Sequence, residues 1–349
     1  MKALTIVPGK ANSAAVKDVP DPPSGDGSIL VKALELGICG TDFELIRAEY
    51  GWAPPGSNHL ILGHESFGRV EEAPPGSGFN KGDLIVGIVR RPDPVPCLAC
   101  AVGQWDMCRN GKYTERGIKE RNGFGSEYWR IEPEFALGLE PTLDTIGVLM
   151  EPTTIVAKAW DHISRIGERA RWEPRTLLVT GAGPIGLLVA LLGKQRGLDV
   201  HVLDVVKEGL KPQLVHDLGG TYHTGPVNKI GFAPDVTIEC TGVAEVIVET
   251  MAHMASDGIL CLLGVSSRNQ AQSIDFGKIN RCLVLENAVI FGCVNANHRH
   301  YELAKQALLK ADRNWISRLI SRRVPLANFE DALKRDPDDI KVVLQLASA

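Results

Sequence analysis

The second half of the chain alternates between short apolar runs that are typical of buried strands and longer segments with helical apolar spacing. Such alternation predicts βαβ units, and therefore a parallel sheet with helices on both faces. The predicted strands and helices cover, in order, residues 176–180, 184–196, 200–203, 210–218, 236–239, 244–254 and 259–263. A helix over 154–166 precedes them, and a strand over 289–294 and a helix over 299–309 follow.

The first half is rich in β-type runs that are separated by Gly and Pro. Apolar strands are predicted at 29–34 and 84–89, each preceded by a turn-rich stretch. An irregular lobe begins near residues 92–96 and contains three of the eight cysteines. Short strands between tight turns predict a compact barrel or sandwich for this half.

Composition narrows the function. A length of 349 residues predicts about two domains. Because the net charge is −4, a polybasic protein that binds nucleic acid or a membrane surface is not expected. The uncharged stretch 176–193 contains a proline and several glycines, so it predicts a strand, a turn and a buried helix rather than a membrane span. No secretory signal pattern is visible, so a cytoplasmic protein is expected, in which clustered cysteines bind metal more often than they form disulfides.

A glycine-rich turn between a predicted strand and a predicted helix indicates a dinucleotide site. The segment Gly181, Ala182, Gly183, Pro184, Ile185, Gly186 matches G-x-G-x-x-G. The first glycine makes the turn, the second lets a pyrophosphate approach the backbone, and the third allows close packing of helix on strand. The helix N-terminus then attracts the phosphate charge.

An acidic residue is expected at the end of the next strand, where it would bind the ribose hydroxyls. Asp204 lies 18 residues after Gly186, as this pattern requires. A carboxylate there would repel a 2′-phosphate, so NAD is expected to be preferred. NADP stays open, because Lys207 nearby would soften that preference.

Cys39 and the pair His64-Glu65 offer the donor types of a zinc site. Thiolate and imidazole suit zinc, and a carboxylate completes a catalytic site that keeps one position open. Either Cys39 or His64 alone would be unremarkable, as a small buried hydrophobe or an ordinary turn residue. Their occurrence in a chain with the dinucleotide motif favours metal binding.

These motifs together carry a family resemblance. GICGTD, GHESFG, KGDLIV and GAGPIG, in this order, resemble the zinc-dependent medium-chain dehydrogenase/reductase superfamily. VRRP, YTERGI, MEPTTI and GCVNANHRHYE resemble its glucose 1-dehydrogenase branch. The resemblance implies an α/β fold with a GroES-like β-barrel catalytic domain, residues 1–152 and 290–349, and a Rossmann domain, residues 153–289. It also implies a homo-oligomer, a dimer or a tetramer.

The resemblance further implies roles around a catalytic zinc. Cys39 and His64 would be ligands, Glu151 would be a third ligand or bind a zinc water, and Glu65 would be an alternative ligand. Which of the two glutamates is the resting ligand stays open.

Two neighbours of Cys39 are implied to assist. Asp42 would orient His64 through its second ring nitrogen. Thr41 would pass the proton of the substrate hydroxyl outward.

The three clustered cysteines resemble the last three ligands of the superfamily's structural zinc lobe. Cys97, Cys100 and Cys108 match, but Pro94 occupies the first ligand position. Three thiolates do not complete a closed tetrahedral site. Either Asp93 supplies the fourth ligand or the lobe holds no metal.

The implied reaction is hydride transfer from C1 of an aldose, with glucose first, to nicotinamide, which yields a lactone. Zinc would act as a Lewis acid on the C1 hydroxyl. Glu115, Asn295 and Glu151 would contact the small neutral sugar or polyol. Asn295 would also touch the cofactor, together with Thr241, Leu263, Gly264 and Val265 at strand ends of the Rossmann domain.

Alternatives remain open at this point. Leu285 stands where some sugar-oxidising relatives carry histidine, so a polyol, secondary-alcohol or threonine dehydrogenase is the nearest alternative. A non-catalytic nucleotide-binding protein is the alternative from another class, and the metal-type residues argue against it.

Overall fold

The computed structural model describes residues 1–266, 272–334 and 336–346. Its contacts divide the chain into two compact units. The first unit contains residues 1–154, 295–310 and the chain from 316 onward, and the second contains residues 155–294 and 311–315. The sequence predicted boundaries at 152/153 and 289/290, and the contacts change a few residues later, at 154/155 and 294/295. The C-terminal segment belongs with the first half of the chain, so the first unit is discontinuous.

The second unit contains a parallel sheet. Among the described residues its strand order is β14-β13-β12-β15-β16-β17, and every neighbouring pair is parallel. The strands are β12 (Thr176–Thr180), β13 (Asp199–Leu203), β14 (Thr221–His223), β15 (Val236–Glu239), β16 (Ile259–Leu262) and β17 (Val289–Gly292). This order reverses between β12 and β15, and ligands bind beyond the carboxyl ends of the strands at such a point.

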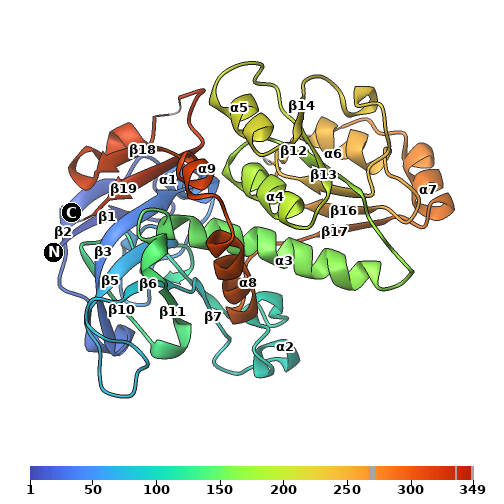
Figure 1. Cartoon of the computed structure of the whole chain (residues 1–349). Helices are drawn as coiled ribbons and strands as arrows, with labels where there is room; N and C mark the ends of the chain where they lie inside the picture. The colour runs from blue at the N-terminus through green and yellow to red at the C-terminus, as the bar shows by residue number, and fades with distance from the viewer. Residues whose placement is uncertain (267–271, 335, 347–349) are drawn as a thin grey trace. The chain divides into compact units, whose positions relative to one another are not determined.

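Helices accompany this sheet, as Figure 1 shows. They are α4 (Pro184–Gln195), α5 (Leu210–Asp217), α6 (Ala244–Met251) and α7 (Phe276–Leu285). The sequence predicted α4, α5 and α6 within a few residues but missed β14 and α7. The edge strand β14 has three residues, which is too short for a periodic signal. The exposed faces of α7 carry apolar residues that obscure its helical pattern.

The first unit is built on antiparallel strands. Its largest sheet, within the described ranges, runs β11-β6-β5-β3-β19-β18, and β10 also pairs with β3. These strands are β3 (Ile29–Ile38), β5 (Glu65–Glu72), β6 (Leu84–Gly87), β10 (Tyr128–Ile131), β11 (Ala136–Leu139), β18 (Ile320–Pro325) and β19 (Lys341–Gln345). The C-terminal strand β19 pairs directly with β3 (Figure 1). The predicted return of the tail to the first domain is therefore present as a strand pairing.

Two smaller sheets and several helices complete this unit. The sheets are β2-β1-β4 and β7-β8-β9, formed by β1 (Lys2–Ile6), β2 (Ala15–Asp18), β4 (Leu60–Ile61), β7 (Arg90–Arg91), β8 (Thr114–Arg116) and β9 (Glu120–Arg121). The helices are α1 (Gly40–Ile46), α2 (Leu98–Ala101), α8 (His298–Leu309) and α10 (Phe329–Ala332). α3 (Met150–Gly167) begins in this unit and continues in the second, where the short α9 (Arg313–Ser317) also begins. The predicted α/β fold, with a β domain and a Rossmann-type parallel sheet, is confirmed.

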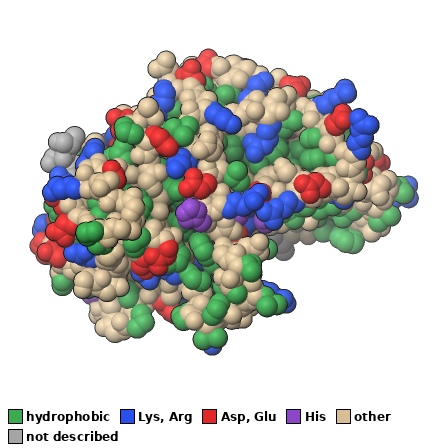
Figure 2. Space-filling model, turned by 60° about the horizontal axis from the view of Figure 1, so that its bottom comes forward, with side chains coloured by type: hydrophobic (Ala, Val, Ile, Leu, Met, Phe, Trp, Pro, Cys, Tyr) green, Lys and Arg blue, Asp and Glu red, His purple; other side chains and the backbone are tan. Residues whose placement is uncertain are grey.

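The distribution of charged side chains on the surface agrees with the small net charge of −4. On the face drawn in Figure 2, basic and acidic side chains are interspersed rather than separated into one basic patch. None of the helices in the described part of the chain is long and apolar enough to span a bilayer.

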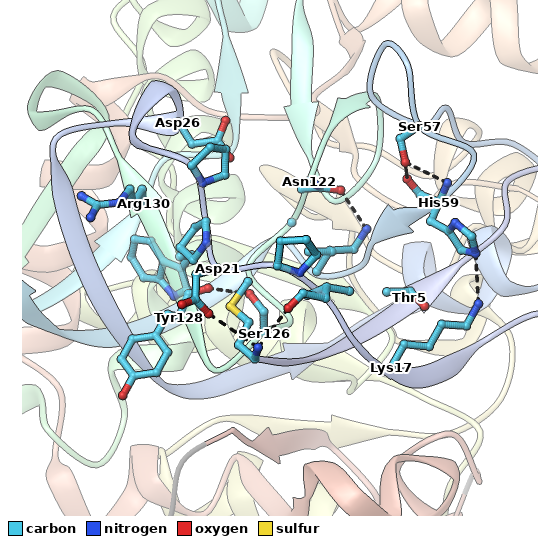
Figure 3. Close-up of a pocket in the computed structure, with 18 of the residues that line it drawn as sticks. Thr5, Lys17, Asp21, Asp26, Ser57, His59, Asn122, Ser126, Tyr128 and Arg130 are labelled. Atoms are coloured by element: carbon cyan, nitrogen blue, oxygen red, sulfur yellow. Dashed lines mark hydrogen bonds and ion pairs between the residues drawn. The ribbon is translucent and has the colours of Figure 1, made fainter.

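A pocket of about 430 Å³ lies in the first unit, lined in part by β1, β2 and the turn at residues 19–23 (Figure 3). None of the residues predicted for the site lines it. Several of its polar groups already bind one another: Lys17 Nζ lies 3.0 Å from His59 Nε2, and Asn122 Oδ1 accepts from the Ile61 N–H at 3.1 Å. This pocket is therefore separate from the candidate chemistry described next.

Candidate active site

Three of the predicted metal ligands converge in the first unit. Cys39 follows β3 directly and caps α1. Glu65 is the first residue of β5, the neighbouring strand, and His64 directly precedes it. The Cys39 Sγ lies 3.1 Å from His64 Nε2. One ligand atom from each of Cys39, His64 and Glu65 lies within 4.8 Å of the other two. The pairing of β3 with β5 thus brings together residues that are 25 positions apart.

Asp42 lies behind His64. It is buried in the first turn of α1, and its Oδ2 accepts a hydrogen bond of 2.9 Å from the Cys39 N–H. Its Oδ1 lies 3.8 Å from His64 Nδ1, on the side of the ring away from Cys39. The orientation fits the predicted role of Asp42, since metal-binding histidines commonly direct their second nitrogen toward a carboxylate.

Glu65 has a partner that sequence reasoning missed. Lys341 Nζ donates to Glu65 Oε1 at 2.6 Å and to the Ile38 carbonyl at 3.1 Å, and both side chains are almost fully buried. The carboxylate lies across Gly37, where any Cβ would collide with Glu65 Oε2. Lys341 opens β19, and only the pairing of β19 with β3 could have indicated this contact.

The buried charges in this cluster favour a bound cation. Burial alone would lower the pKa of His64, but Cys39 and Asp42 raise it well above its usual value. Burial raises the pKa of the Cys39 thiol, and the negative charges of Asp42 and Glu65 add to this effect. His64 Nδ1 and Asp42 Oδ1 are buried without a hydrogen-bond partner and lie 3.8 Å apart, on the side of the ring away from Cys39. The donor set of thiolate, imidazole and carboxylate fits zinc.

Glu151 lies outside the three-ligand group. It occupies the first turn of α3, and its charge acts on His64 without its oxygens joining the 4.8 Å cluster. Burial raises its pKa to about 7, and the nearby Glu65 adds to that shift. A carboxyl group with this pKa can exchange a proton near neutral pH.

Thr41, the predicted proton-transfer residue, interacts with a second hydroxyl group, that of Tyr50. Thr41 and Glu44 both lie in α1, and both act on the Tyr50 hydroxyl: Thr41 lowers its pKa and Glu44 raises it. Burial raises the pKa of Tyr50, so its hydroxyl stays protonated at neutral pH. The Tyr50 hydroxyl is therefore the polar group through which Thr41 and Glu44 are connected.

Glu115 and Asn295, the predicted sugar contacts, touch each other. Asn295 Nδ2 donates to Glu115 Oε1 at 2.6 Å, although the two residues are 180 positions apart. Glu115 lies in β8 and is only 8% exposed. Arg90, directly opposite in β7, also donates to its Oε1. The sequence did not indicate this partner.

The three-cysteine lobe is assembled without a cysteine at position 94. The sulfur atoms of Cys97, Cys100 and Cys108 lie within 4.8 Å of one another. Asp93 is buried and its Oδ2 has no hydrogen-bond partner, whereas its Oδ1 accepts from the Val95 N–H at 2.8 Å. The Arg109 N–H, with other backbone donors, lowers the pKa of Cys97 to about 6, so this group is mainly thiolate at neutral pH.

In the second unit, the glycine-rich turn connects β12 with α4. Gly181 has φ +91°, and a side chain at Gly186 would collide with the Gly181 carbonyl. Gly183 faces open space, where a bound phosphate could approach. Pro184 and Ile185 form the first turn of α4. The three glycines therefore meet the three geometric requirements of a dinucleotide loop.

Asp204 follows β13 and holds the same turn. Its Oδ2 accepts from the Ala182 N–H at 2.6 Å and its Oδ1 from the Val206 N–H at 3.0 Å. Both oxygens retain a lone pair. The carboxylate is thus fixed beside the turn, as a ribose-binding acid must be.

The remaining predicted cofactor residues gather around Glu239, a buried acid at the end of β15 that sequence reasoning did not single out. The N–H groups of Leu263 and Gly264 donate to its carbonyl at 2.8 and 3.0 Å. The Thr241 N–H donates to its Oε1 at 2.7 Å. Val265 follows and is exposed. These residues share the carboxyl edge of β15 and β16.

Comparisons with known proteins agree with this geometry. The family described as "Alcohol dehydrogenase GroES-like domain" matches residues 25–141, and the family described as "Glucose dehydrogenase C-terminus" matches residues 144–346. The chain thus combines the two parts of an alcohol dehydrogenase-like medium-chain enzyme. It belongs to the glucose dehydrogenase family.

Similar proteins cover the full length. A glucose 1-dehydrogenase of Methanocella arvoryzae is 40% identical over 100% of both chains, and one of Thermoproteus tenax is 36% identical over 99% of both. The structure of Haloferax mediterranei glucose dehydrogenase in complex with NADP, Zn and gluconolactone aligns with a TM-score of 0.92 at 29% identity, over 100% of both chains. Galactitol-1-phosphate dehydrogenase from Escherichia coli, at 20% identity and a TM-score of 0.79, shares the fold.

Proposed function

We propose that this protein is a zinc-dependent NAD(P) oxidoreductase that oxidises the C1 hydroxyl of an aldose, with glucose first, to the lactone. The observation that carries this proposal is the full-length likeness to a glucose dehydrogenase whose structure contains NADP, Zn and gluconolactone. The grouping of Cys39, His64 and Glu65 supplies the matching chemistry in this chain.

Cys39, His64 and one of the carboxylates would hold the zinc. When bound, zinc supplies Lewis-acid polarisation of the sugar's C1 hydroxyl. Because Lys341 holds Glu65, Glu151 is the carboxylate with freedom to bind at this site or to hydrogen-bond a water there. Asp42 keeps the His64 ring oriented.

Thr41, Tyr50 and Glu44 would carry the hydroxyl proton outward, since Thr41 and Glu44 both act on the Tyr50 hydroxyl. Glu115, Asn295 and Glu151 would bind the sugar. A hydroxyl-rich substrate needs fixed partners, because each buried polar group left unpaired costs roughly 1–3 kcal/mol. The Gly181–Gly186 turn, Asp204, Thr241, Leu263, Gly264 and Val265, with Asn295, would bind the dinucleotide.

A substrate panel tests this function. Glucose and other aldoses, polyols, secondary alcohols and threonine are assayed with NAD and NADP, with absorbance at 340 nm as the readout. We expect the highest kcat/KM on an aldose. Turnover confined to polyols, simple secondary alcohols or threonine would contradict the aldose assignment, and no turnover by zinc-loaded protein would favour a non-catalytic nucleotide-binding protein.

NAD is proposed as the preferred cofactor, with NADP accepted. Changing Asp204 to Asn removes the charge but keeps an oxygen that can accept from Ala182 or Val206. We expect the NADP-to-NAD ratio of kcat/KM to rise about tenfold, which corresponds to about 1.4 kcal/mol. Asp199→Asn, at the other end of β13, is the matched control. An unchanged ratio would show that Asp204 does not discriminate between the two cofactors.

The three-cysteine lobe is proposed as a second zinc site, with Asp93 completing it after a shift of its loop. The supporting observations are the sulfur grouping and the orphaned buried Asp93 Oδ2. Metal analysis should then give two zinc ions per wild-type chain and one in the Cys97→Ser, Cys108→Ser double variant. One zinc in both proteins would show that the lobe holds none.

We also propose a cytoplasmic homo-oligomer, a dimer or a tetramer. None of the eight cysteines is paired in a disulfide, which suits a reducing compartment. The strand β17 lies at the edge of its sheet, and exposed apolar side chains of the same unit include Phe276, Val284 and Leu285. Sheet edges and exposed large apolar side chains are both typical of interfaces. Light scattering should give at least twice the mass of one chain, and a monomer at micromolar concentration would contradict the assembly.

A further inference from the structure

The Glu115 carboxylate has one crowded oxygen and one open oxygen. Arg90 donates to Oε1 through Nε at 3.1 Å and through Nη2 at 3.0 Å, and Asn295 Nδ2 donates to the same atom at 2.6 Å. Within the described residues, no hydrogen bond reaches Oε2. All three donors therefore fix the carboxylate through Oε1 and leave Oε2 available as an acceptor.

Arg90 is itself held on several sides. It is 6% exposed, its Nη1 donates to the Asp106 carbonyl at 3.1 Å, and its guanidinium lies 3.7 Å from the centre of the Tyr113 ring. The backbone pairing of β7 with β8 sets Arg90 directly opposite Glu115. The guanidinium cannot turn away from Glu115 without losing the carbonyl contact and the ring contact.

The turn that holds Arg90 is connected to the segment that carries Asn295. Asp106 lies in the 3-10 helix η2 (Trp105–Met107) of the cysteine lobe, and its Oδ1 accepts from Asn297 Nδ2 at 2.7 Å. Asn295 has φ +63°, a conformation that asparagine tolerates better than most residues. Asp106 thus accepts from Arg90 through its carbonyl and from Asn297 through its side chain. It therefore connects Arg90 with the segment that contains Asn295, the other donor to Glu115 Oε1.

We propose that Arg90 is a positioning residue for substrate recognition: by filling Oε1 together with Asn295, it presents Oε2 of Glu115 to a hydroxyl of the sugar. This inference rests on the proposed function of the same site. The planar guanidinium fork supplies two donors in fixed directions, which the single ammonium of lysine cannot reproduce. Loss of the fork lets the carboxylate rotate, so substrate binding weakens while the chemistry at C1 is unaffected.

Arg91 provides a matched control. It is the next residue of β7, it is 5% exposed, and it also pairs with a glutamate, since its Nε and Nη2 donate to Glu132. It makes no hydrogen bond to Glu115. If buried arginines of this strand have only a structural role, substitution at either position should change the sugar KM alike. If Arg90 positions Glu115, only substitution of Arg90 should raise the sugar KM.

The experiment compares Arg90→Lys, Arg91→Lys, Glu115→Gln and the Arg90→Lys, Glu115→Gln double variant by steady-state kinetics on glucose. We expect Arg90→Lys to raise KM for the sugar about tenfold, with kcat within about threefold and KM for the dinucleotide unchanged. Arg91→Lys should leave both KM values within about twofold. In the Glu115→Gln background, Arg90→Lys should change the sugar KM less than about twofold, because Arg90 acts through Glu115. Arg90→Gln, which keeps one side-chain donor group, gives the same readout if the lysine variant does not fold.

Three results would overturn the proposal. Equal sugar KM values in the two lysine variants would assign Arg90 a structural role only. An unchanged KM in Glu115→Gln would remove Glu115 as a sugar contact, although glucose oxidation itself would stand. Failure of the wild-type enzyme to oxidise any aldose would instead remove the proposed function, and this inference with it.

Discussion

Replacing Cys39 by Ser should remove the zinc of the catalytic site and lower kcat/KM at least about 1000-fold, which corresponds to about 4 kcal/mol of transition-state stabilisation. The Cys39 sulfur lies 3.1 Å from His64 Nε2 and is the softest donor of the cluster. A serine hydroxyl is a poor zinc ligand at neutral pH, because it does not ionise as a thiol does. Metal content and kcat/KM, measured on the same preparation, test this prediction.

A second cysteine variant controls for the general effect of losing a thiol. Cys282 is half-buried in α7 and belongs to none of the metal-type clusters of the described residues. Cys282→Ser should keep its zinc and its activity. If Cys39→Ser retained more than a tenth of the wild-type activity, Cys39 could not be an essential ligand.

Replacing Lys341 by Met should destabilise the protein by about 3–5 kcal/mol, because the Glu65 carboxylate would be left buried without its cation. Burial alone would lower the pKa of Lys341, but Glu65 and Cys39 raise it, so the ammonium stays charged in the native protein. Glu65 is 2% exposed and cannot recover this interaction from water. The midpoint of thermal unfolding and the free energy from urea denaturation are the measurements.

Two further variants separate loss of the ion pair from loss of side-chain packing. The Glu65→Gln, Lys341→Met double variant should regain part of the lost stability, since no charge is then left unpaired. Lys334→Met removes an exposed ion pair with Asp331 and should leave the midpoint unchanged. A Lys341→Met protein that unfolds at the wild-type temperature would show that the Glu65 contact contributes little.

Much of the second unit could be predicted from local sequence. The strands at 176–180 and 236–239 agree with the structure residue by residue, because buried parallel strands are short apolar runs between clear turn residues. The glycine turn and Asp204 could also be found, since their functions depend on backbone conformation and on a fixed spacing. Glu239 was missed because its contacts come from backbone groups that follow two adjacent strands, β15 and β16.

In the first unit, the types of chemical group were predictable but their partners were not. The motifs around Cys39 and His64 indicated a metal site, and the structure places these residues in contact. Glu151 was expected to be a third ligand or to bind a zinc water, and it lies outside the closest group. Nothing local at position 115 indicated that its carboxylate would be buried against Arg90.

The sequence by itself determined the class of fold, the dinucleotide turn and the kinds of donor available for zinc, because each depends on residues that are close in the chain. Only the tertiary structure decided which cation pairs with the Glu65 carboxylate. Lys341, 276 residues from Glu65, reaches it through the pairing of β19 with β3, and Gly37 leaves the space in which the carboxylate lies. Long-range strand pairing sets these contacts, and a pattern read along the chain carries no information about which distant strand will lie beside it.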